Sequence, residues 1–396
     1  MLPQIISWEQ RKLSDIADLI GGNAWKSKDY STDGKYLVVT IANVSGAPYI
    51  NEVGNKINAV NNSPFILSKD DILVSLTGNV GRVSKMSDIP AVLNQRVGKI
   101  IPKFCTTDRD FLFSLLHNSH FETAMIEAGQ GAAQKNISNL DVLNYELCIP
   151  PERREQIQIG NFFSNLDNLI TLHQKKVSSL QIIKKSMLEK MFPKEGSKVP
   201  EIRFSGFTDD WEQRKWSDTV DISTNMVDPR LGKYDDLPHI APGNIESYTG
   251  RLYDNVKTVK EENLISGKFH FLPGDIVYGK INPQLGKYYF SDCEGLTSAD
   301  AYVLNAKNGI NQEYLFAIIQ TENFFKYSIS VSKRSGMPKI NRDELNAYEY
   351  WSPSEEEQRR IGTFFLTLDS LITLHQKESD KLTIFKKSLL TEMFPK

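Results

Sequence analysis

The chain contains one unit twice, and this duplication constrains its fold more than any other sequence feature. Residues 169–194 read LITLHQKKVSSLQIIKKSMLEKMFPK and residues 371–396 read LITLHQKESDKLTIFKKSLLTEMFPK, with 17 identical positions. A shorter phrase, WEQRK, starts at Trp8 and again at Trp211. The offset is 202 or 203 residues, so the copies stay in step along nearly the whole chain. Two equivalent units favour a pseudo-two-fold arrangement and predict a protein that binds two copies of something.

Composition sets the class of protein. With 396 residues, 40% hydrophobic and 24% charged, the chain is long enough for two or more domains with real cores. The three cysteines are far apart and form no CxxC pair, which is typical of a reducing compartment. The N-terminus lacks a signal-peptide core, and no apolar run approaches the ~18 residues of a membrane span. We therefore expect a soluble protein in the cytoplasm.

Charge argues against a basic, non-specific nucleic-acid binder. The net charge is −2. A DNA partner would therefore require locally focused basic residues, or phosphate contacts supplied by other subunits.

Each unit reads as a mixed domain followed by a long helix. Strand-like runs bounded by turn residues come first and a helical stretch follows, so the pattern predicts an α+β fold. The runs are 36–41, 71–76 and 97–101, then 276–278 and 301–305, with helical stretches at 109–129 and from 311 to about 327. The predicted domains are 1–150 (mixed), 151–194 (helix), 195–206 (linker), 207–353 (mixed) and 354–396 (helix).

Both long helices are predicted to start at prolines, Pro150-Pro151 and Pro353, with Ser354 and Glu357 as a capping box. Apolar residues then recur every three or four positions over more than four heptads, as in a coiled coil. Neither helix can bury such a seam alone, and the short linker predicts that they pair antiparallel. The seams are Ile159, Phe163, Leu166, Ile170, His173, Val177, Leu180, Ile183, Met187 and Met191, and Ile361, Phe365, Leu368, Ile372, His375, Ser379, Leu382, Phe385, Leu389 and Met393.

The order domain–helix–domain–helix resembles the specificity subunit of type I restriction–modification enzymes. Three phrases carry the resemblance: VPEIRFSGFTDDWEQRK at 199–215, DDILVSLTGNVGRV at 70–83 and PPERREQIQIGNFF at 150–163. The resemblance covers essentially the whole chain. The phrases are individually weak, but their order and duplication together are specific.

The resemblance implies a function. Each mixed domain would be a target recognition domain that reads one half of a split DNA sequence, and the helices would set the unread gap. The helices would also bind two methyltransferase subunits, which restriction–translocase subunits would join. The chain itself would be non-catalytic, and S-adenosylmethionine, ATP and Mg²⁺ would belong to the partners.

Two loops in each unit are candidate DNA contacts, because glycine lets the backbone approach phosphate while amide and basic side chains read base edges. An ordinary hairpin turn or a flexible polar loop explains them about equally well. The first set is Thr77, Asn79 and Arg82, with Lys280, Asn282, Gln284 and Lys287 as counterparts. The second set is Gln130, Gln134 and Lys135, with Lys333, Arg334 and Lys339 as counterparts, and Asn94, Gln95 and Arg96 are further candidate readers.

Other repeated features are interpreted as structural. In WEQRK, we expect the tryptophan to pack and the charges to face solvent. The seam histidines, His173 and His375, resemble single polar residues that fix register. The repeated KKS triplets at 184–186 and 386–388 are basic helix faces, either solvated or facing DNA or an acidic partner.

Two rival functions remain. A scaffold that pairs two proteins without touching DNA would explain duplicated helices, but not divergent domains rich in polar loops. A metal-dependent nuclease would need convergent carboxylates and a lysine. The acidic residues near strand starts, Asp70, Asp71 and Asp275, form no repeated set. The chain also lacks GxxxxGK[ST], HExxH and GxSxG motifs.

Overall fold

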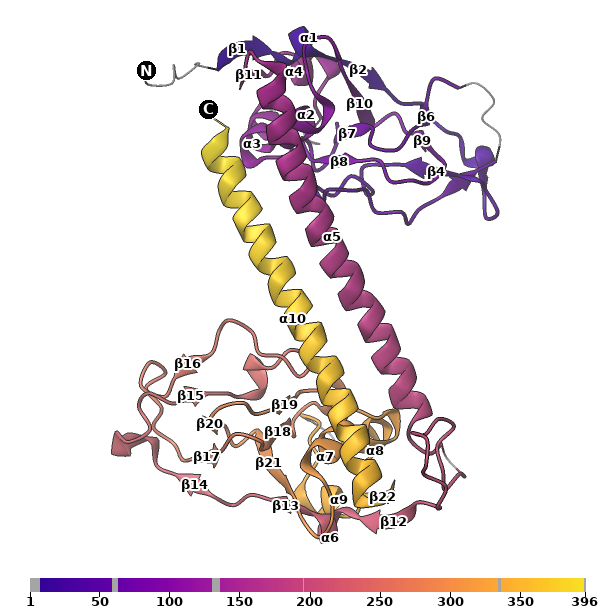
Figure 1. Ribbon diagram of the computed structural model, residues 1–396. Coiled ribbons are helices and arrows are strands. Elements are labelled where there is room, and N and C mark those ends of the chain that lie inside the picture. The colour runs from indigo at the N-terminus through magenta and orange to yellow at the C-terminus, as the bar shows by residue number, and fades with distance from the viewer. Residues whose placement is uncertain (1–7, 59–62, 130–135, 195, 334–335, 395–396) are drawn as a thin grey trace. The chain divides into compact units, whose positions relative to one another are not determined.

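The computed structural model describes residues 8–58, 63–129, 136–194, 196–333 and 336–394. It divides into two compact units (Figure 1): unit 1 comprises Met1–His173 and Glu378–Lys396, and unit 2 comprises Gln174–Lys377. Each unit therefore holds one mixed domain together with a part of both long helices. The α+β class and the internal repeat predicted from the sequence are confirmed.

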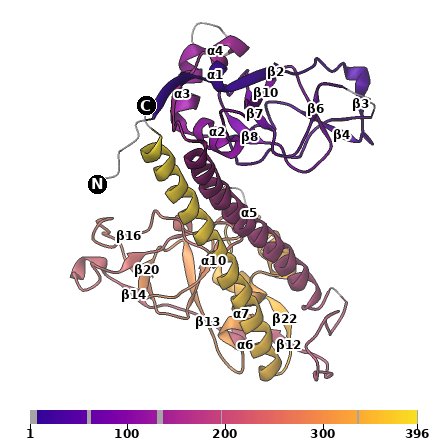
Figure 2. The same ribbon diagram turned by 45° about the horizontal axis from the view of Figure 1, so that its top comes forward.

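The mixed domain of unit 1 is built on three sheets (Figure 2). The inner strands are mostly apolar, and all four residues of β7 are buried. The first sheet pairs β1 (Glu9–Lys12) with β11 (Glu146–Ile149). The second has the strand order β2 (Ala17–Gly21), β10 (Val97–Pro102), β7 (Ile72–Ser75) and β8 (Val83–Lys85). The third has the order β3 (Tyr30–Ser31), β5 (Lys56–Ile57), β4 (Tyr36–Val39), β9 (Ala91–Leu93) and β6 (Ile66–Leu67). The short helices are α1 (Leu13–Ile16), α4 (Asn139–Leu143) and the 3₁₀ turn η1 (Ser27–Asp29).

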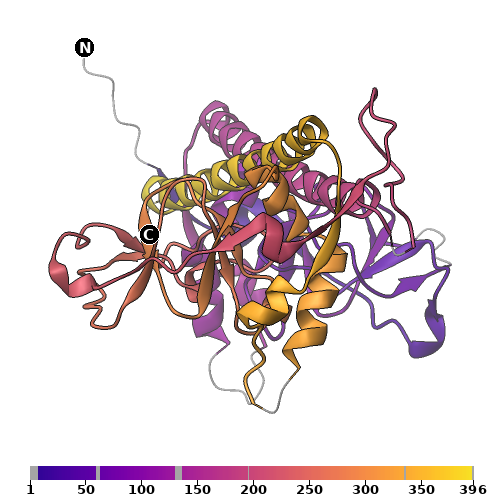
Figure 3. The same cartoon turned by 90° about the horizontal axis from the view of Figure 1, so that it is seen from below.

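Unit 2, seen from below in Figure 3, repeats the two-stranded and four-stranded sheets of unit 1. The five-stranded sheets differ in their edge strand: β3 pairs with β5 in unit 1, whereas β14 (Met226–Val227) pairs with β17 (Lys268–Phe271) in unit 2. Its two-stranded sheet pairs β12 (Glu212–Lys215) with β22 (Glu349–Ser352). The four-stranded sheet has the order β13 (Val220–Ile222), β21 (Ala301–Ala306), β18 (Ile276–Gly279) and β19 (Tyr288–Phe290). The five-stranded sheet has the order β14 (Met226–Val227), β17 (Lys268–Phe271), β20 (Gly295–Thr297), β15 (Pro238–His239) and β16 (Lys257–Thr258). The short helices are α6 (Trp216–Thr219), α9 (Arg342–Asn346), η2 (Pro229–Leu231), η3 (Pro242–Asn244) and η4 (Pro283–Leu285).

The repeated WEQRK phrase has the structural role expected for it. Its charged residues form the exposed strands β1 and β12, which pair with β11 and β22. Trp8 packs edge-on against Phe111, and Trp211 is buried in the core of unit 2. The phrase closes each mixed domain by joining its first strand to its last.

Each predicted helical stretch after the strands is in fact two helices. In unit 1 the stretch divides into α2 (Arg109–Leu116) and α3 (Ser119–Ala128). The Asn118 side chain caps α3 by accepting hydrogen bonds from two backbone N–H groups, so the chain starts a second helix there. In unit 2, the Thr321 side chain caps α8 (Glu322–Ser332) by accepting one hydrogen bond, from the Phe324 N–H, and so separates α8 from α7 (Gln312–Ile318). The apolar periodicity continues across the break, which is why the sequence suggested one helix.

The long helices are α5 (Arg153–Lys190) and α10 (Glu355–Met393). Within unit 1, the start of α5 lies beside the end of α10, since Phe163 contacts Phe394 with ring centroids 5.8 Å apart. Within unit 2, the end of α5 lies beside the start of α10, where Phe192 and Phe365 are 6.0 Å apart. In both units the two segments are therefore antiparallel.

The seam follows the predicted heptads with one correction in each helix. Phe163, Leu166, Ile170 and Leu180 on α5 are buried, as are Phe365, Leu368 and Ile372 on α10, while Leu382 is partly buried. However, Ile183 and Phe385 are exposed, at 45% and 50%. The heptad places the next residue, Lys184 or Lys386, in the seam instead, and both lysines are buried. The prediction chose Ile183 and Phe385 because they are apolar, and it was wrong at these two positions.

The predicted capping box at the start of α10 is only half formed. The Ser354 hydroxyl accepts a hydrogen bond from the Glu357 N–H at 3.4 Å. The Glu357 carboxylate instead accepts two hydrogen bonds from the Arg203 guanidinium, at 2.9 and 2.7 Å. A buried ion pair with the linker that enters unit 2 thus replaces the second half of the box.

Candidate nucleic-acid interface

In unit 1 three predicted contact segments meet at one edge of the mixed domain. Thr77 forms a β-bridge with Asn136, so the loop after β7 lies against the segment that precedes α4. The Ile137 N–H donates to the Leu76 carbonyl at 2.9 Å, and the Leu76 N–H donates to the Arg96 carbonyl at 3.0 Å. The fold thus brings together residues about 20 to 60 positions apart in the sequence.

The loop 77–82 presents Asn79 and Gly78 to solvent on a braced turn. The Arg82 N–H donates to the Ser75 hydroxyl at 3.1 Å, which in turn donates to the Asn79 carbonyl. Gly78 has φ of 72°, a conformation that glycine adopts without strain. The expectation that both glycines serve close phosphate approach is wrong for Gly81. It is buried, and a Cβ there would lie 2.6 Å from the Met125 Cβ.

The basic and amide side chains of this edge differ in how free they are. The Arg82 guanidinium lies 3.4 Å from Glu122 in a partly exposed ion pair, which costs little to break. Gln95 and Arg96 are exposed. The Asn94 side chain accepts a hydrogen bond from the Arg96 N–H at 3.2 Å and so shapes the turn that carries them. Thr77 is mostly buried.

Unit 2 forms the corresponding edge with different chemistry. Ile281 forms a β-bridge with Lys339, and the Asn282 N–H donates to the Pro338 carbonyl at 2.7 Å. The Ile340 N–H donates to the Lys280 carbonyl at 2.9 Å. The two predicted loops are therefore neighbours here as well, and this edge carries Lys280 and Lys339 where unit 1 has Leu76 and Asn136.

Two cations flank one tyrosine ring at the unit 2 edge. The Lys280 ammonium lies 5.1 Å and the Arg342 guanidinium 5.5 Å from the centre of the Tyr302 ring. Burial lowers the pKa of Lys280; the Asp300 carboxylate opposes this shift, and the charges of Lys339 and Arg342 add to it. Arg342 also donates to the Ile222 and Ser223 carbonyls at 2.7 and 2.8 Å. No sequence pattern predicts a role for Arg342, which only the fold brings to this site.

Three other predicted residues of unit 2 lie in or next to the η4 turn. Gln284 is exposed, and its backbone carbonyl accepts a hydrogen bond from the Tyr248 hydroxyl. The Lys287 ammonium instead donates to the Ile245 carbonyl and lies 5.4 Å from the Tyr253 ring centre, so it stabilises the fold around the turn. Asn282, with φ of 46°, begins the turn. Lys333 and Lys339 are exposed, while Gln130, Gln134, Lys135 and Arg334 lie outside the described residues.

The KKS triplets are not simply basic surface. Lys386 lies 2.6 Å from Asp167 in unit 1, and Lys184 pairs with Asp369 in unit 2. All four side chains are at most 14% exposed. The neighbouring Lys185 and Lys387 are exposed, as the sequence suggested for the whole triplet.

The opposite side of the helix pair from each domain is apolar. In unit 1, Leu169 and Leu172 on α5 are exposed together with Ile384 and Phe385 on α10. Leu169 and Phe385 each directly precede a seam residue, so in an antiparallel pair they project to the same side. Residues on the other side face the domain, since a Cβ on Gly160 would lie 2.5 Å from the Phe111 backbone nitrogen. In unit 2, Leu371, Leu374, Ile182 and Ile183 form the equivalent exposed set.

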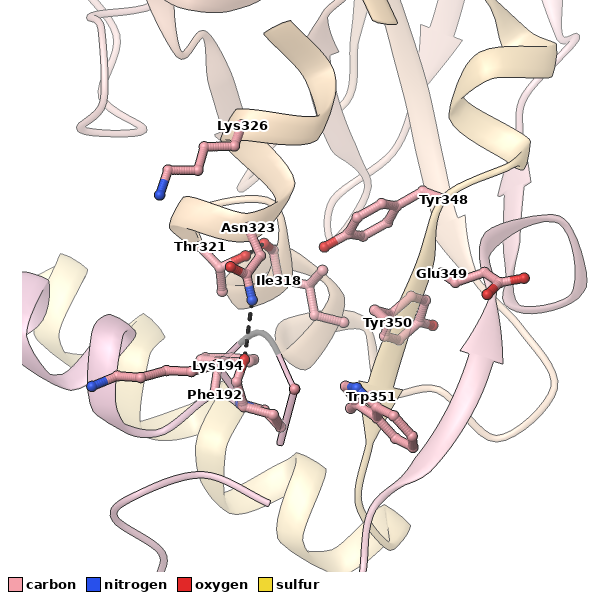
Figure 4. A pocket seen from close by; sticks show the side chains of 12 residues that line it. Phe192, Lys194, Ile318, Thr321, Asn323, Lys326, Tyr348, Glu349, Tyr350 and Trp351 are labelled. Atoms are coloured by element: carbon pink, nitrogen blue, oxygen red, sulfur yellow. Dashed lines mark hydrogen bonds between the residues drawn. The ribbon is translucent and has the colours of Figure 1, made fainter. Parts of the chain in front are cut away.

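A pocket of about 390 Å³ lies in unit 2 where α5 ends (Figure 4). Four aromatic side chains line it, and the side-chain amide of Asn323, another lining residue, donates to the Pro193 carbonyl at 3.0 Å. The aromatic residues are Phe192, Tyr348, Tyr350 and Trp351. None of the predicted DNA-contacting residues lines this pocket.

The described residues form neither a cluster of metal-binding side chains nor a membrane-spanning helix. Among the described residues, no three His, Cys, Asp or Glu side chains gather closely enough to hold a metal ion. None of the described helices, α5 and α10 included, combines the length and apolar character that crossing a membrane requires.

The type I restriction modification DNA specificity domain matches this sequence twice, over residues 6–181 and 208–383. The chain belongs to this family. Each match spans one mixed domain and most of the helix that follows it. The family's repeat is thus the repeat seen in the sequence and in the two units.

Individual relatives agree with this assignment. The chain is 28% identical over 210 residues to the specificity subunit of the type I restriction enzyme EcoDI of Escherichia coli, a match that covers 51% of this chain and 46% of the relative. It is 23% identical over 369 residues to the MjaVIII specificity subunit of Methanocaldococcus jannaschii, covering 85% and 81%. The chain thus matches less than half the length of the first of these relatives.

The fold is shared with a solved member of the family. The crystal structure of the S subunit of the type I restriction–modification system from M. genitalium superposes with a TM-score of 0.73. The superposition covers 100% of this chain and 98% of that one, at 16% sequence identity. At this identity the likeness concerns the fold, and it supports the predicted architecture of mixed domains and long helices.

Proposed function

We propose that this chain is the DNA-specificity subunit of a type I restriction–modification complex, in which each mixed domain reads one half of a bipartite target. The observation that carries the proposal is a contrast within the repeat. The two domains share the four-stranded sheet and its connections and bring equivalent loops to one edge. Yet that edge carries Arg82, Asn94, Gln95 and Arg96 in unit 1, and Lys280, Asn282, Lys339 and Arg342 in unit 2. Different half-sites require such a difference, because base edges are distinguished by the donors and acceptors offered to them.

The sequences of the helices support a shared task for the two units. The helices are nearly duplicated whereas the mixed domains diverge. Continuous helices of 38 and 39 residues would separate the half-sites by a fixed, unread gap. The polar edges would supply positioning contacts to phosphates and reading contacts to bases.

The apolar sets on the helices support two copies of one protein partner. Each set combines two exposed residues from α5 with two from α10, and the two sets are equivalent under the repeat. Exposed apolar clusters of this kind mark protein-binding sites. We assign them to two methyltransferase subunits, to which the restriction–translocase subunits would then bind.

We further propose that the chain has no catalytic role of its own. S-adenosylmethionine, ATP and Mg²⁺ would bind the partner subunits, and this chain would supply target choice. A duplicated scaffold that never touches DNA would not need edges that differ in chemistry.

Sequencing of DNA methylation in the host, with and without this gene, tests the proposal. We expect deletion to abolish adenine methylation at a single motif composed of two short half-sites around a fixed gap. Supplying the gene again should restore that motif. An unchanged methylation pattern in a host whose methyltransferase partner is expressed would contradict the proposed function.

A further inference from the structure

The buried ion pairs in the helix seam are related by the repeat. Asp167 and Asp369 occupy equivalent positions in the phrases LDNLITLHQK and LDSLITLHQK, and Lys184 and Lys386 in the phrase KKS. Asp167 pairs with Lys386 within unit 1, and Lys184 pairs with Asp369 within unit 2. The aspartate and the lysine are separated by the same number of residues on both helices. One antiparallel register therefore closes both pairs at once.

These pairs impose an energetic cost on the seam in both units. Burial raises the pKa of the Asp167 carboxyl and lowers that of the Lys386 ammonium, while their mutual attraction opposes both shifts. Burial likewise raises the pKa of Asp369. One oxygen of each carboxylate, Oδ2, is buried without a hydrogen-bond partner in the described structure. Apolar residues of similar size would serve stability as well or better, so the pairs point to specificity of assembly.

The charges discriminate between ways of pairing the helices. In the antiparallel register each aspartate meets a lysine. If α5 and α10 were instead aligned in parallel by their repeat, Asp167 would face Asp369 and Lys184 would face Lys386. Two buried like-charge contacts would then replace two ion pairs. A buried polar residue in an otherwise apolar seam is a known means of fixing register and orientation.

Each ion pair also touches the mixed domain of its own unit. The Lys386 ammonium lies 3.1 Å from Nδ1 of His117, the residue that directly precedes Asn118, the cap of α3. His117 is stacked on Phe113 of α2, and its Nε2 donates to the Gly46 carbonyl at 2.7 Å. In unit 2, Gln320 directly precedes the cap of α8, as His117 does that of α3, and its side chain lies close enough to Asp369 to oppose the rise in the pKa of that carboxyl. The residues that pair the helices therefore also fix where each domain sits on its helices.

We propose that Asp167–Lys386 and Asp369–Lys184 are specificity-determining pairs: they select the antiparallel register of α5 and α10 and thereby the length of the gap between the half-sites. This inference rests on the proposed function for its consequence on DNA. Its statement about helix pairing stands on the two units alone.

Two double variants of identical composition and net charge test the proposal. The paired variant, Asp167→Lys with Lys386→Asp, keeps opposite charges together in both units. The crossed variant, Asp167→Lys with Lys184→Asp, brings like charges together in both units. The quadruple variant, which adds Lys386→Asp and Asp369→Lys to the crossed one, restores opposite charges throughout. Two readouts are compared: the melting temperature of the purified full-length chain and the methylated motif in cells.

We expect the paired and quadruple variants to melt near the wild type and to methylate the same motif with the same gap. The crossed variant should melt at least about 10 °C lower and lose that motif, because breaking buried pairs is strongly destabilising. A crossed variant that matches the paired one in both readouts would overturn the proposal, as would a paired variant that fails as badly as the crossed one. If the wild type shows no split motif, the proposed function fails, while the melting comparison still tests the helix pairing.

Discussion

His117 and Gln320 occupy equivalent positions but give the two units different responses to pH. Burial, together with the charges of Lys386 and Lys85, lowers the pKa of His117 to about 3, and the hydrogen bond to Gly46 opposes the shift. His117 is therefore neutral when the protein is folded, whereas in the unfolded chain its pKa is about 6.5. Because the unfolded state binds the proton more readily, His117 costs stability as the pH falls below 6.5.

Replacement of His117 by Gln, the residue of unit 2, should remove this pH dependence. For the wild type we expect the His117 contribution to the free energy of unfolding to fall by about 2 kcal/mol between pH 8 and pH 5. Melting curves at both pH values measure it. The variant should lose less stability over this range than the wild type. An equal loss in both proteins would show that His117 is protonated in the folded state.

Arg82 is the basic residue of the unit 1 loop whose removal should affect DNA without affecting the fold. Its ion pair with Glu122 is partly exposed, so Arg82→Ala should leave the melting temperature nearly unchanged. If Arg82 reads a base, binding of the assembled complex to its target should weaken by about 10- to 100-fold, measured by fluorescence anisotropy. Arg154→Ala, at an exposed arginine near the start of α5, is the control. Equal DNA affinities of the two variants would show that Arg82 does not contribute to DNA binding.

At the scale of elements, the spacing of apolar residues and the positions of turn residues predicted most of the structure. The strands around β7, β10 and β18, the helix starts after Pro151 and Pro353 and the antiparallel pairing all follow from apolar periodicity and turn residues. The errors share a cause. Lys184 and Lys386 enter the seam because a partner aspartate on the other helix compensates each charge, and no local pattern reveals such a partner. Arg342 was missed for the same reason, since only the tertiary fold brings it beside Lys280.

Gly160 and Gly362 show another element-scale constraint, the close approach of each domain to its helix. A Cβ at Gly160 would lie 2.5 Å from the Phe111 nitrogen, and one at Gly362 would lie 2.6 Å from the Tyr314 nitrogen. Both contacts are to backbone, which cannot move aside cheaply. Alanine normally favours a helix by about 1 kcal/mol over glycine, yet Gly160→Ala should destabilise by about 1–3 kcal/mol. Chemical denaturation measures this, with Asn161→Ala as a control that is expected to be neutral. A stabilised Gly160→Ala protein would contradict the packing described.

At the scale of the whole molecule, the duplication separates a shared task from two individual ones. The helices keep their seam, ion pairs and apolar sets in both copies, while the polar edges of the mixed domains differ. The sequence predicts this division well, because identity between the copies can be compared position by position. It does not predict which bases are read, since that depends on how each edge meets DNA and on the shape of the DNA itself.

The helices should act as a ruler for the gap. Insertion of the same heptad after Gln174 and after Gln376 keeps the seam in phase and lengthens each helix by about 10 Å. This corresponds to about three base pairs of DNA. Methylation sequencing should reveal the same half-sites separated by a longer gap. Altered half-sites with an unchanged gap would contradict the claim that helix length sets the gap.

The most direct test of the account exchanges one mixed domain. Residues 7–150 would be replaced by the corresponding domain of another specificity subunit whose half-sites are known, and the methylated motif would be determined in cells. We expect one half-site to change to that of the donor domain, while the other half-site and the gap stay the same. A motif in which both half-sites change, or in which neither does, would contradict the claim that each unit reads its own half of the target.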